Sequence, residues 1–368
     1  MLFQLYFVLL RGKKTIYNVI MRHYKYYKVN PFPLIVVLCL ALSGNVMAGE
    51  KGKLRAIGFY NVENLFDTTH DEGKLDEDFL PEGRNEWTPV KYSHKLANIS
   101  AVLAEMATDK VGKQGCDIIG LAEVENSHVL DDLIAQEPLR KRGYKYCHIE
   151  GPDMRGIDCA LLYNPKKFKL RDVKLVPYIQ ELKRDSAFRT RGFLTVSGTY
   201  CGEHLTVVVC HLPSRGATEF YRRLGARQIK ALRDSLLSDD PQLRLIVMGD
   251  MNDDPMDKSM ALELRGKRSL QEVGEGDMFN PWWNDLAEGH GSMTFNGLPN
   301  LFDQILLSPS LVRGEGNVLR YADHEIFSRH YLFNPTGNFK GYTKRTHSGA
   351  TWLDGYSDHL PTIVYLRK

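Results

Sequence analysis

Acidic, amide and imidazole side chains recur at one kind of position in this sequence, next to the end of a short apolar run. Glu123 follows the run DIIGLA, His211 follows TVVVC, and Asp250 follows LRLIVMG. Carboxylate oxygens suit hard divalent cations such as Mg²⁺, and an imidazole with a pKa near neutrality can take a proton from water. Together these side chains could bind a metal ion and activate a water molecule for hydrolysis.

Four more residues extend the pattern. Asn252 lies in GDMND just after Asp250, and Asp358 and His359 precede the apolar run TIVYL. Asp303 lies in FDQILL, where a carboxylate flanked by apolar residues needs a partner. Each residue alone has an ordinary explanation, as a turn residue, a solvated residue that opens a helix, or a structural histidine. Their joint placement at strand ends, along one rim of a sheet, favours a shared site.

The segments between these residues predict a mixed α/β body, because short apolar runs rich in β-branched residues alternate with amphipathic patterns. The predicted strands are residues 54–61, 117–122, 158–163, 192–198, 204–211, 243–249, 302–307 and 361–366. Apolar residues spaced by three and four predict helices near 92–108 and 217–237. Residues 68–90 and 312–350 are predicted as long loops that cover one face. No repeat or linker is visible in the sequence, which favours a single domain.

The composition is that of an ordinary globular protein, with 43% hydrophobic and 25% charged residues. The 48 basic residues nearly balance the 45 acidic ones, so no strong overall field attracts nucleic acid. An anionic substrate must therefore be held by a local group of basic residues.

The beginning of the chain resembles a targeting segment, because it combines basic residues with apolar runs and contains no acidic residue before Glu50. Its apolar run from Phe32 to Leu42 is much shorter than the roughly 20 residues of a membrane span. The small residue Ala48 fits the cleavage rule of signal peptides.

We therefore predict a signal peptide region at residues 1–48 and a single domain at residues 49–368. Met21 begins a better-formed signal than Met1 does, so residues 1–20 lie before an alternative start. The mature protein is expected to be secreted or periplasmic, and to meet the membrane only through its signal peptide. An uncleaved N-terminal anchor is the alternative.

The cysteines indicate neither a fixed set of disulfides nor a zinc site. One of the six, Cys39, lies in the predicted signal peptide region, and the five that remain cannot all pair. Cys159 and Cys210 lie in apolar runs, which is typical of small buried thiols. No Cys/His spacing matches a zinc knuckle.

Seven segments resemble, in order along the chain, the motifs of the endonuclease/exonuclease/phosphatase superfamily. They are FYNVENLFD (59–67), LAEVEN (121–126), RGIDCALLY (155–163), HLPSR (211–215), MGDMND (248–253), LFDQILLS (301–308) and YSDHLP (356–361). The pattern GD-x-N, followed near the chain end by SDH, is the signature pair of that superfamily. The opening NVENLFD and the HLPSR segment are most similar to its bacterial extracellular-nuclease-like branch.

The resemblance implies a fold and a set of residue roles. The fold is a four-layered α/β sandwich, in which two mixed β-sheets pack face to face with helices outside. The implied metal ligands are Asn61, Glu123 and Asp358, and the implied ion is Mg²⁺ or Mn²⁺. The implied catalytic residues are His211, Asp250, Asn252, Asp303 and His359.

Within that set, the resemblance makes His359 the general base and Asp303 the carboxylate that orients it. Asp250 and Asn252 would position the attacking water and the phosphoryl oxygens, and His211 would stabilise the transition state or the leaving oxygen. A carboxylate on the second imidazole nitrogen fixes the tautomer and stabilises the imidazolium, so the pair is chemically reasonable.

Arg155, Arg191 and Arg215 lie in or beside these motifs and are the candidate residues for binding the substrate phosphate. A guanidinium can hold a phosphate by two parallel hydrogen bonds. Exposure to solvent on the protein surface is the ordinary alternative for each of them.

The predicted protein is a metal-dependent phosphoric ester hydrolase, a nuclease by first choice, with a phosphoester and above all nucleic acid as its partner. The alternative is a phosphatase or phosphodiesterase that acts on a small or lipid-linked phosphate, of the sphingomyelinase or inositol-phosphate type. A non-catalytic binding protein is disfavoured, because every matched position carries the residue type that catalysis needs. No obligate protein partner is expected.

Overall fold

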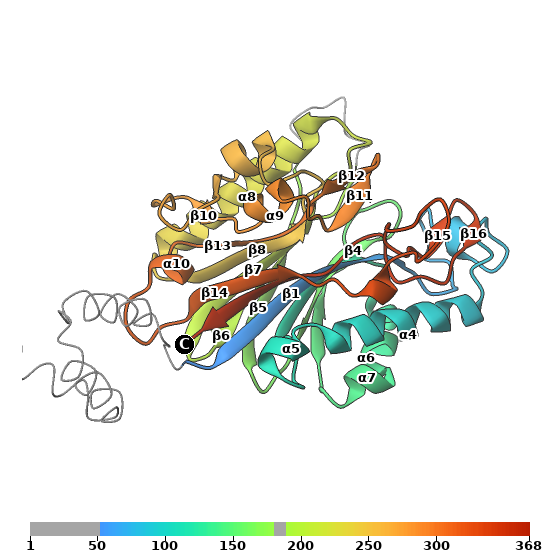
Figure 1. The fold of residues 1–368 in the computed structure, drawn as a ribbon, viewed down its shortest axis with the longest axis horizontal. Coiled ribbons are helices and arrows are strands. Elements are labelled where there is room, and N and C mark those ends of the chain that lie inside the picture. Colours follow the sequence, from blue (N-terminus) through green and yellow to red (C-terminus); the bar gives the residue numbers. More distant parts are fainter. Residues whose placement is uncertain (1–51, 180–188) are drawn as a thin grey trace, which may run out of the picture. The chain divides into compact units, whose positions relative to one another are not determined.

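The computed structural model describes residues 52–179 and 189–368. The predicted signal peptide region, residues 1–48, lies outside the described residues. From Lys53 onward the chain forms one compact unit built around two β-sheets (Figure 1).

The first sheet has six strands in the order β14-β17-β1-β2-β4-β3. Their bounds are β1 (Leu54–Leu65), β2 (Ile118–Val124), β3 (Lys145–His148), β4 (Asp158–Tyr163), β14 (Arg320–Ile326) and β17 (Thr362–Arg367). β1 and β2 run parallel, and the other neighbours are antiparallel, so the sheet is mixed.

The second sheet has seven strands in the order β5-β6-β7-β8-β13-β10-β9. Their bounds are β5 (Phe168–Val176), β6 (Phe193–Tyr200), β7 (Glu203–His211), β8 (Arg244–Asp250), β9 (Gly266–Lys267), β10 (Met278–Phe279) and β13 (Asp303–Leu307). The central pair β7 and β8 is parallel, and antiparallel β13 follows β8.

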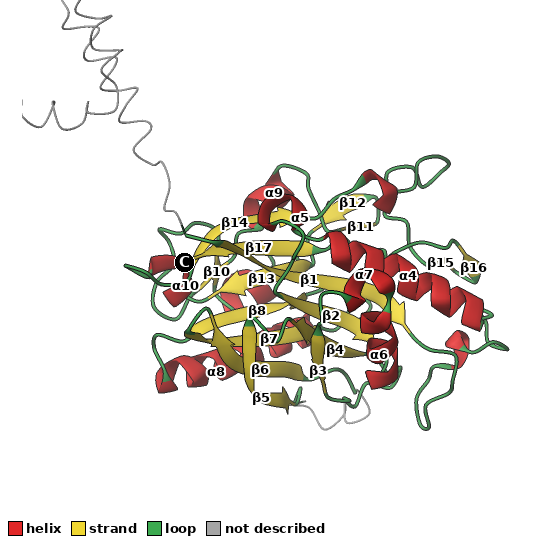
Figure 2. Cartoon of the chain, turned by 90° about the horizontal axis from the view of Figure 1, so that it is seen from below, coloured by secondary structure: helices red, strands yellow, loops and turns green. Residues whose placement is uncertain are grey.

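Helices cover the outer face of each sheet (Figure 2). Against the first sheet pack α4 (Pro89–Glu105), α6 (Ser127–Ala135) and α7 (Glu137–Arg140), and against the second packs α8 (Glu219–Asp239) beside the π-helical turn η3 (Ser259–Glu263). The remaining elements are η1 (Glu77–Phe79), α5 (Thr108–Val111), α9 (Trp283–Ala287), β11 (Met293–Phe295), β12 (Leu298–Asn300), α10 (Ser310–Arg313), η4 (His330–Leu332), β15 (His347–Ser348) and β16 (Thr351–Trp352). Helix, sheet, sheet and helix therefore form the four layers of a sandwich.

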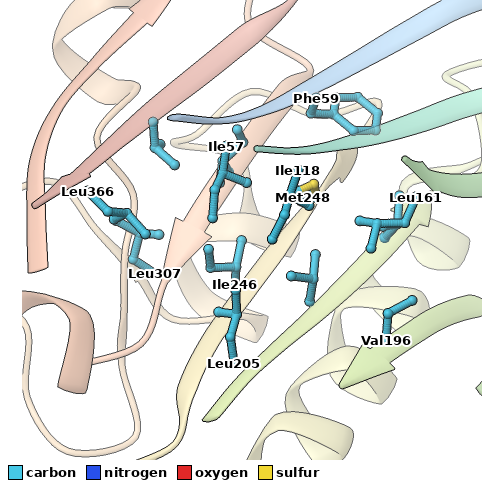
Figure 3. Close-up of a cluster of buried hydrophobic side chains, with 14 of the residues drawn as sticks. Ile57, Phe59, Ile118, Leu161, Val196, Leu205, Ile246, Met248, Leu307 and Leu366 are labelled. Atoms are coloured by element: carbon cyan, nitrogen blue, oxygen red, sulfur yellow. The ribbon is translucent and has the colours of Figure 1, made fainter. Parts of the chain in front are cut away.

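The main core lies between the two sheets. Ile57, Phe59 and Ile118 of the first sheet share this layer with Ile246 and Met248 of the second, and all five are fully buried (Figure 3). Because successive residues of a strand point to opposite faces, the residues between them pack against the helices instead. The central strands are thus apolar on both faces, as expected for sheets covered on both sides.

The predicted fold class is confirmed, and each of the eight predicted strands and both predicted helices correspond to an observed element. The prediction of a loop over residues 312–350 is wrong for β14, which pairs with β17 at the sheet edge. Its segment RYADHEI contains several charged residues and remains partly exposed, so the sequence shows little apolar alternation there. Pairing with β17, and not local pattern, makes it a strand.

The five cysteines of the described chain are free, and four of them are buried. Burial raises the pKa of Cys116, Cys147, Cys159 and Cys210, which keeps these thiols protonated. Within the described residues no helix is long and apolar enough to cross a membrane.

The inter-sheet core predicts a large difference between two identical substitutions. Leu205→Ala removes a fully buried side chain from this layer, and we expect it to lower the free energy of unfolding by about 2–5 kcal/mol. Leu75→Ala, at a side chain that is 56% exposed, should change it by less than about 0.5 kcal/mol. Urea denaturation followed by circular dichroism measures the free energy of unfolding of both variants. Equal losses would contradict the position of Leu205 in the inter-sheet core.

Candidate active site

Four polar residues lie in the inter-sheet layer where the strands end. Alternate residues of β1, β7 and β8 face the opposite sheet, and the period of two continues to Asn61, His211 and Asp250. β13 begins with such a residue, Asp303, directly opposite Asp250 in the antiparallel pair. All four are buried. The alternation that fills the core with apolar side chains therefore gathers these polar groups at one end of the same layer.

Glu123 joins them through an irregularity in β2. Strict alternation would place it on the helix-covered face with Ile119 and Leu121, but the register shifts between Ala122 and Val124. Glu123 adopts a left-handed backbone conformation with φ of 64°. A β-bulge of this kind redirects a side chain.

The redirected carboxylate contacts the first strand. Its Oε1 lies 3.4 Å from Asn61 Nδ2, and its Oε2 accepts a hydrogen bond of 2.9 Å from the backbone N–H of Asn64. The same Asn61 amide donates to Asp250 Oδ2 at 3.0 Å. Glu123 and Asp250 therefore meet at a single side chain.

His359 and Asp303 form a buried pair. His359 Nδ1 lies 2.7 Å from Asp303 Oδ2, and Ser292 Oγ donates to the same carboxylate oxygen. The backbone N–H of His359 donates to Ser357 Oγ, which in turn donates to the carbonyl oxygen of Asn61. These contacts hold both the ring and the backbone of His359.

The other nitrogen of His359 faces the remaining carboxylates. Nε2 lies 3.8 Å from Asp250 Oδ2 and 3.8 Å from Asp358 Oδ1. Burial lowers the pKa of His359, but the negative charges of Asp303, Asp250 and Asp358 outweigh burial and hold it well above the usual value. Burial also raises the pKa of Asp250 to about 7, an effect that the charge of His359 opposes.

The pKa of His211 is shifted in the opposite direction to that of His359. Its Nε2 lies 3.5 Å from Asp250 Oδ2 and 3.9 Å from Glu123 Oε1. Burial, followed by the positive charges of Arg191 and Arg155, holds the pKa of His211 well below its usual value. His211 is therefore neutral at neutral pH and can donate a hydrogen bond without carrying charge. Two groups whose environments drive their pKa values apart are typical of acid–base sites.

Asn252 lies in the turn after β8. It has φ of 50°, its backbone N–H donates to Asp250 Oδ1 at 2.9 Å, and its side-chain amide donates to the carbonyl oxygen of Leu212 at 3.0 Å. Asn252 is thus fixed between the ends of β7 and β8.

A pocket of about 960 Å³ opens over this group. Nine of its lining residues were expected at the site from the sequence: Glu123, Arg155, Arg191, His211, Arg215, Asp250, Asn252, Asp358 and His359. Asn61 and Asp303 lie behind this wall and support it.

The three predicted phosphate-binding arginines have different surroundings. Arg155 is half exposed, whereas Arg191 is buried, with hydrogen bonds to Asp153 and to the Leu212 carbonyl oxygen. Arg215 donates to carboxylates of the loop after β8 and to the Asn252 carbonyl oxygen, and its guanidinium lies 4.4 Å from the ring centroid of Phe302. Arg155 is the most available of the three, while the other two are largely committed to the protein.

Other pocket residues were not predicted from the sequence. They include Phe295, Phe302, Phe339, Tyr342 and Arg345. Arg345, Phe339 and Tyr342 lie in the segment expected to be a loop, where no periodic pattern indicates a role. Glu63, which holds Arg345, lies within the NVEN motif two residues after Asn61. Its position in this motif, close to Asn61, was the sequence signal that could have identified Glu63 as a site residue.

The donor set fits a hard divalent cation. Asn61 brings the carboxylates of Glu123 and Asp250 together, and no Lys or Arg of the described chain forms an ion pair with either. Atoms of Asp250, Asp303 and His359 also lie within 4.8 Å of one another. Because His359 and Asp303 hydrogen-bond to each other, that second group fits an acid–base pair, whereas the carboxylate of Glu123 in the first group fits a metal ligand.

Solved structures share this fold. A protein of the endonuclease/exonuclease/phosphatase family from Bacteroides thetaiotaomicron is 16% identical over 86% of this chain and 98% of that one, with a TM-score of 0.52. The mannosyl-6-phosphatase of Bacteroides thetaiotaomicron VPI-5482 is 17% identical over 85% of this chain and 99% of that one, also with a TM-score of 0.52. A D. rerio TDP2 humanized by 14 mutations is 15% identical over 86% and 100%, with a TM-score of 0.51.

The sequence comparison identifies the family. The model of the Endonuclease/Exonuclease/phosphatase family matches residues 56–368, and a search of curated proteins gives no match. Fold and site define an enzyme that hydrolyses phosphoric esters with a divalent metal ion. The chain belongs to the Endonuclease/Exonuclease/phosphatase family. The predicted superfamily is thereby confirmed, and the bacterial extracellular-nuclease-like branch stays a prediction.

The buried pair predicts a shift in the pH profile. The carboxylate of Asp303 raises the pKa of His359, so Asp303→Asn should lower that pKa. If His359 is the base, the rising limb of kcat/KM against pH moves to lower pH. The plateau rate should fall on the order of 10²–10⁴-fold.

His359→Ala should abolish the limb, and the double variant should be little slower than either single variant, because the two residues serve one step. Asp323→Asn, at an exposed carboxylate of β14, is the matched control and should keep the wild-type profile. If kcat/KM of His359→Ala still rises with pH as in the wild type, another group is the base.

Proposed function

We propose that this protein is a secreted, Mg²⁺-dependent nuclease that hydrolyses phosphodiester bonds by in-line attack of a water activated by His359. The observation that carries the proposal is the 2.7 Å contact between His359 Nδ1 and Asp303, which leaves Nε2 facing the pocket beside Asp250 and Asp358. A fixed imidazole at this position can accept a proton from a water molecule.

Asn61, Glu123 and Asp358 are the residues that would hold the ion, which is Mg²⁺ or Mn²⁺. When bound, the ion would neutralise negative charge on the phosphoryl group and polarise it. Oxygen ligands from carboxylate and amide groups suit such hard cations. The carboxylate of Glu123 lies against Asn61 and Asn64 and forms no ion pair with a Lys or Arg of the described chain, which supports this assignment.

The remaining polar residues position the reacting groups. Asp250 and Asn252, joined by a hydrogen bond of 2.9 Å, lie where they can orient the water and a phosphoryl oxygen. Neutral His211 can donate a hydrogen bond to a developing oxyanion. Arg155, Arg191 and Arg215 supply positive charge to the pocket wall, where they would bind substrate phosphate.

The shape and lining of the pocket favour a nucleotide-containing substrate. Its volume of about 960 Å³ far exceeds that of one phosphate group, and both aromatic rings and arginines line it. Base–aromatic stacking contributes about 1–3 kcal/mol per base in nucleic acid complexes. Phe295 and Phe339 are both exposed at the pocket, where a base could stack on them.

A phosphatase acting on a small phosphomonoester is the second candidate. The solved structure of the mannosyl-6-phosphatase shares the fold with a TM-score of 0.52, so the scaffold also supports that reaction class. We propose secretion on the basis of the N-terminal segment alone, because its pattern of basic residues and a short apolar run fits a signal peptide.

Chelation tests the metal requirement. We expect EDTA to abolish hydrolysis of bis-p-nitrophenyl phosphate, and Mg²⁺ or Mn²⁺ to restore it, because the carboxylates of the site need a cation before an anionic substrate can approach. Product release is followed by absorbance. Full activity after exhaustive chelation would exclude the metal-dependent mechanism.

A substrate panel separates the two candidate functions. Purified protein with Mg²⁺ is offered plasmid DNA, single-stranded RNA, bis-p-nitrophenyl phosphate and p-nitrophenyl phosphate at equal concentrations. A nuclease should prefer the polymers and the diester. Preference for the monoester by more than about tenfold in kcat/KM, a difference of about 1.4 kcal/mol, would favour the phosphatase.

Glu123→Gln tests the metal ligand itself. The substitution keeps the shape but removes the charge, so we expect weaker Mg²⁺ binding by calorimetry and a metal-free melting temperature close to that of the wild type. Glu137→Gln, at an exposed residue of α7 paired with Lys141, is the control and should bind Mg²⁺ normally. Loss of folding in Glu123→Gln would instead indicate a structural role.

A further inference from the structure

Arg345 is a pocket residue whose guanidinium is held by two carboxylates. Its Nε donates to Glu63 Oε1 at 3.1 Å, and its Nη2 donates to Asp358 Oδ2 at 2.9 Å. The side chain is 47% exposed and lines the pocket with Glu123 and His359. Its Nη1 forms no hydrogen bond with any residue that the structure describes. One edge of the guanidinium is therefore fixed, and another is available.

The carboxylate of Glu63 holds Arg345 in this arrangement. It is buried, it has a left-handed φ of 51°, and its Oε2 accepts a hydrogen bond of 2.7 Å from the backbone N–H of Thr346. One carboxylate thus holds both the side chain of Arg345 and the backbone of the next residue. A left-handed non-glycine residue costs on the order of 1–3 kcal/mol, and such residues cluster at functional sites.

Lys95 of α4 completes the support. It is buried, and its Nζ donates to Thr346 Oγ1 at 2.6 Å and to the Tyr356 carbonyl oxygen at 2.7 Å. These hydrogen bonds attach both ends of the segment that carries β15 and β16 to α4. Buried ion groups are weak evidence for stability, since apolar residues pack there as well or better. The arrangement of Glu63 and Lys95 around the exposed guanidinium of Arg345 instead indicates that they orient this guanidinium.

We propose that Arg345 binds a phosphoryl oxygen of the substrate and that Glu63 is the positioning residue that aims it; this rests on the proposed phosphoesterase function. A guanidinium presents N–H donors in a rigid fork that matches phosphate, and its contact with Asp358 places that fork at the candidate metal site. Arg191 is buried and Arg215 donates to the loop after β8, whereas Arg345 is 47% exposed in the pocket and its Nη1 has no partner among the described residues.

Chemical rescue tests the proposal. Arg345→Ala should lower kcat/KM for bis-p-nitrophenyl phosphate on the order of 10²-fold, as does loss of one donor to a developing oxyanion. Because the side chain is half exposed in the pocket, millimolar guanidinium should enter the vacated space and restore at least a tenth of the lost kcat/KM. Arg345→Lys keeps the charge without the fork, so its kcat/KM should lie between those of the wild type and the alanine variant.

Arg329→Ala is the matched control. Arg329 also bridges two carboxylates, Glu105 and Asp109, and is partly exposed, but it does not line the pocket. It should retain wild-type kcat/KM and show no response to guanidinium.

Glu63→Gln tests the positioning residue. We expect it to lower kcat, to respond little to guanidinium because Arg345 is still present, and to be non-additive with Arg345→Ala. If Glu63→Gln does not fold, the half-exposed Arg345 variants decide alone. Wild-type kcat/KM in Arg345→Ala, or a loss that guanidinium and lysine both fail to restore, would overturn the proposal. A wild-type enzyme inactive on every phosphoester would instead overturn the proposed function.

Discussion

A polar side chain that points between two packed sheets has no water to bind, so it must find a partner within the protein. This constraint organises the site. Asp303 and Asp250 face each other across neighbouring strands inside the inter-sheet layer, and both are buried. Asp303 accepts hydrogen bonds from His359 and Ser292, and Asp250 accepts them from Asn61 and from the backbone of the following turn. Hydrogen bonds to these two buried carboxylates bring donors from segments that are distant in the sequence into a single network at the open end of the layer.

The same burial separates the behaviour of the two histidines. His211 has arginines nearby and no close carboxylate hydrogen bond, so burial and positive charge keep its neutral form. His359 is equally buried, but Asp303, Asp250 and Asp358 surround it and favour its protonated form. One fold thus presents a neutral donor and a base with a raised pKa on the same side of a pocket. The difference comes from neighbouring charge, because the degree of burial is nearly the same for the two rings.

Backbone conformation contributes as well. Glu123, Asn252, Glu63 and Asn64 all have positive φ, in a region where such residues cost on the order of 1–3 kcal/mol each. The structure compensates with hydrogen bonds at these points, including those from Asn64 N–H to Glu123 and from Asn252 N–H to Asp250. At Glu63, Asn64 and Glu123 the pairing register of β1 and β2 shifts, and Glu123 turns from the helix-covered face toward the pocket.

The sequence by itself determined the apolar runs, and with them the strands and the positions of Asn61, His211, Asp250 and Asp303 at their ends, because alternation with a period of two is a local property. It also carried the ordered motifs that indicate the family. It did not determine β14 or the contact between Glu63 and Arg345, which are 282 residues apart. Only the tertiary structure decided these, since strand pairing, burial and the charges that shift a pKa arise when distant segments meet, and no local pattern of residues records that meeting.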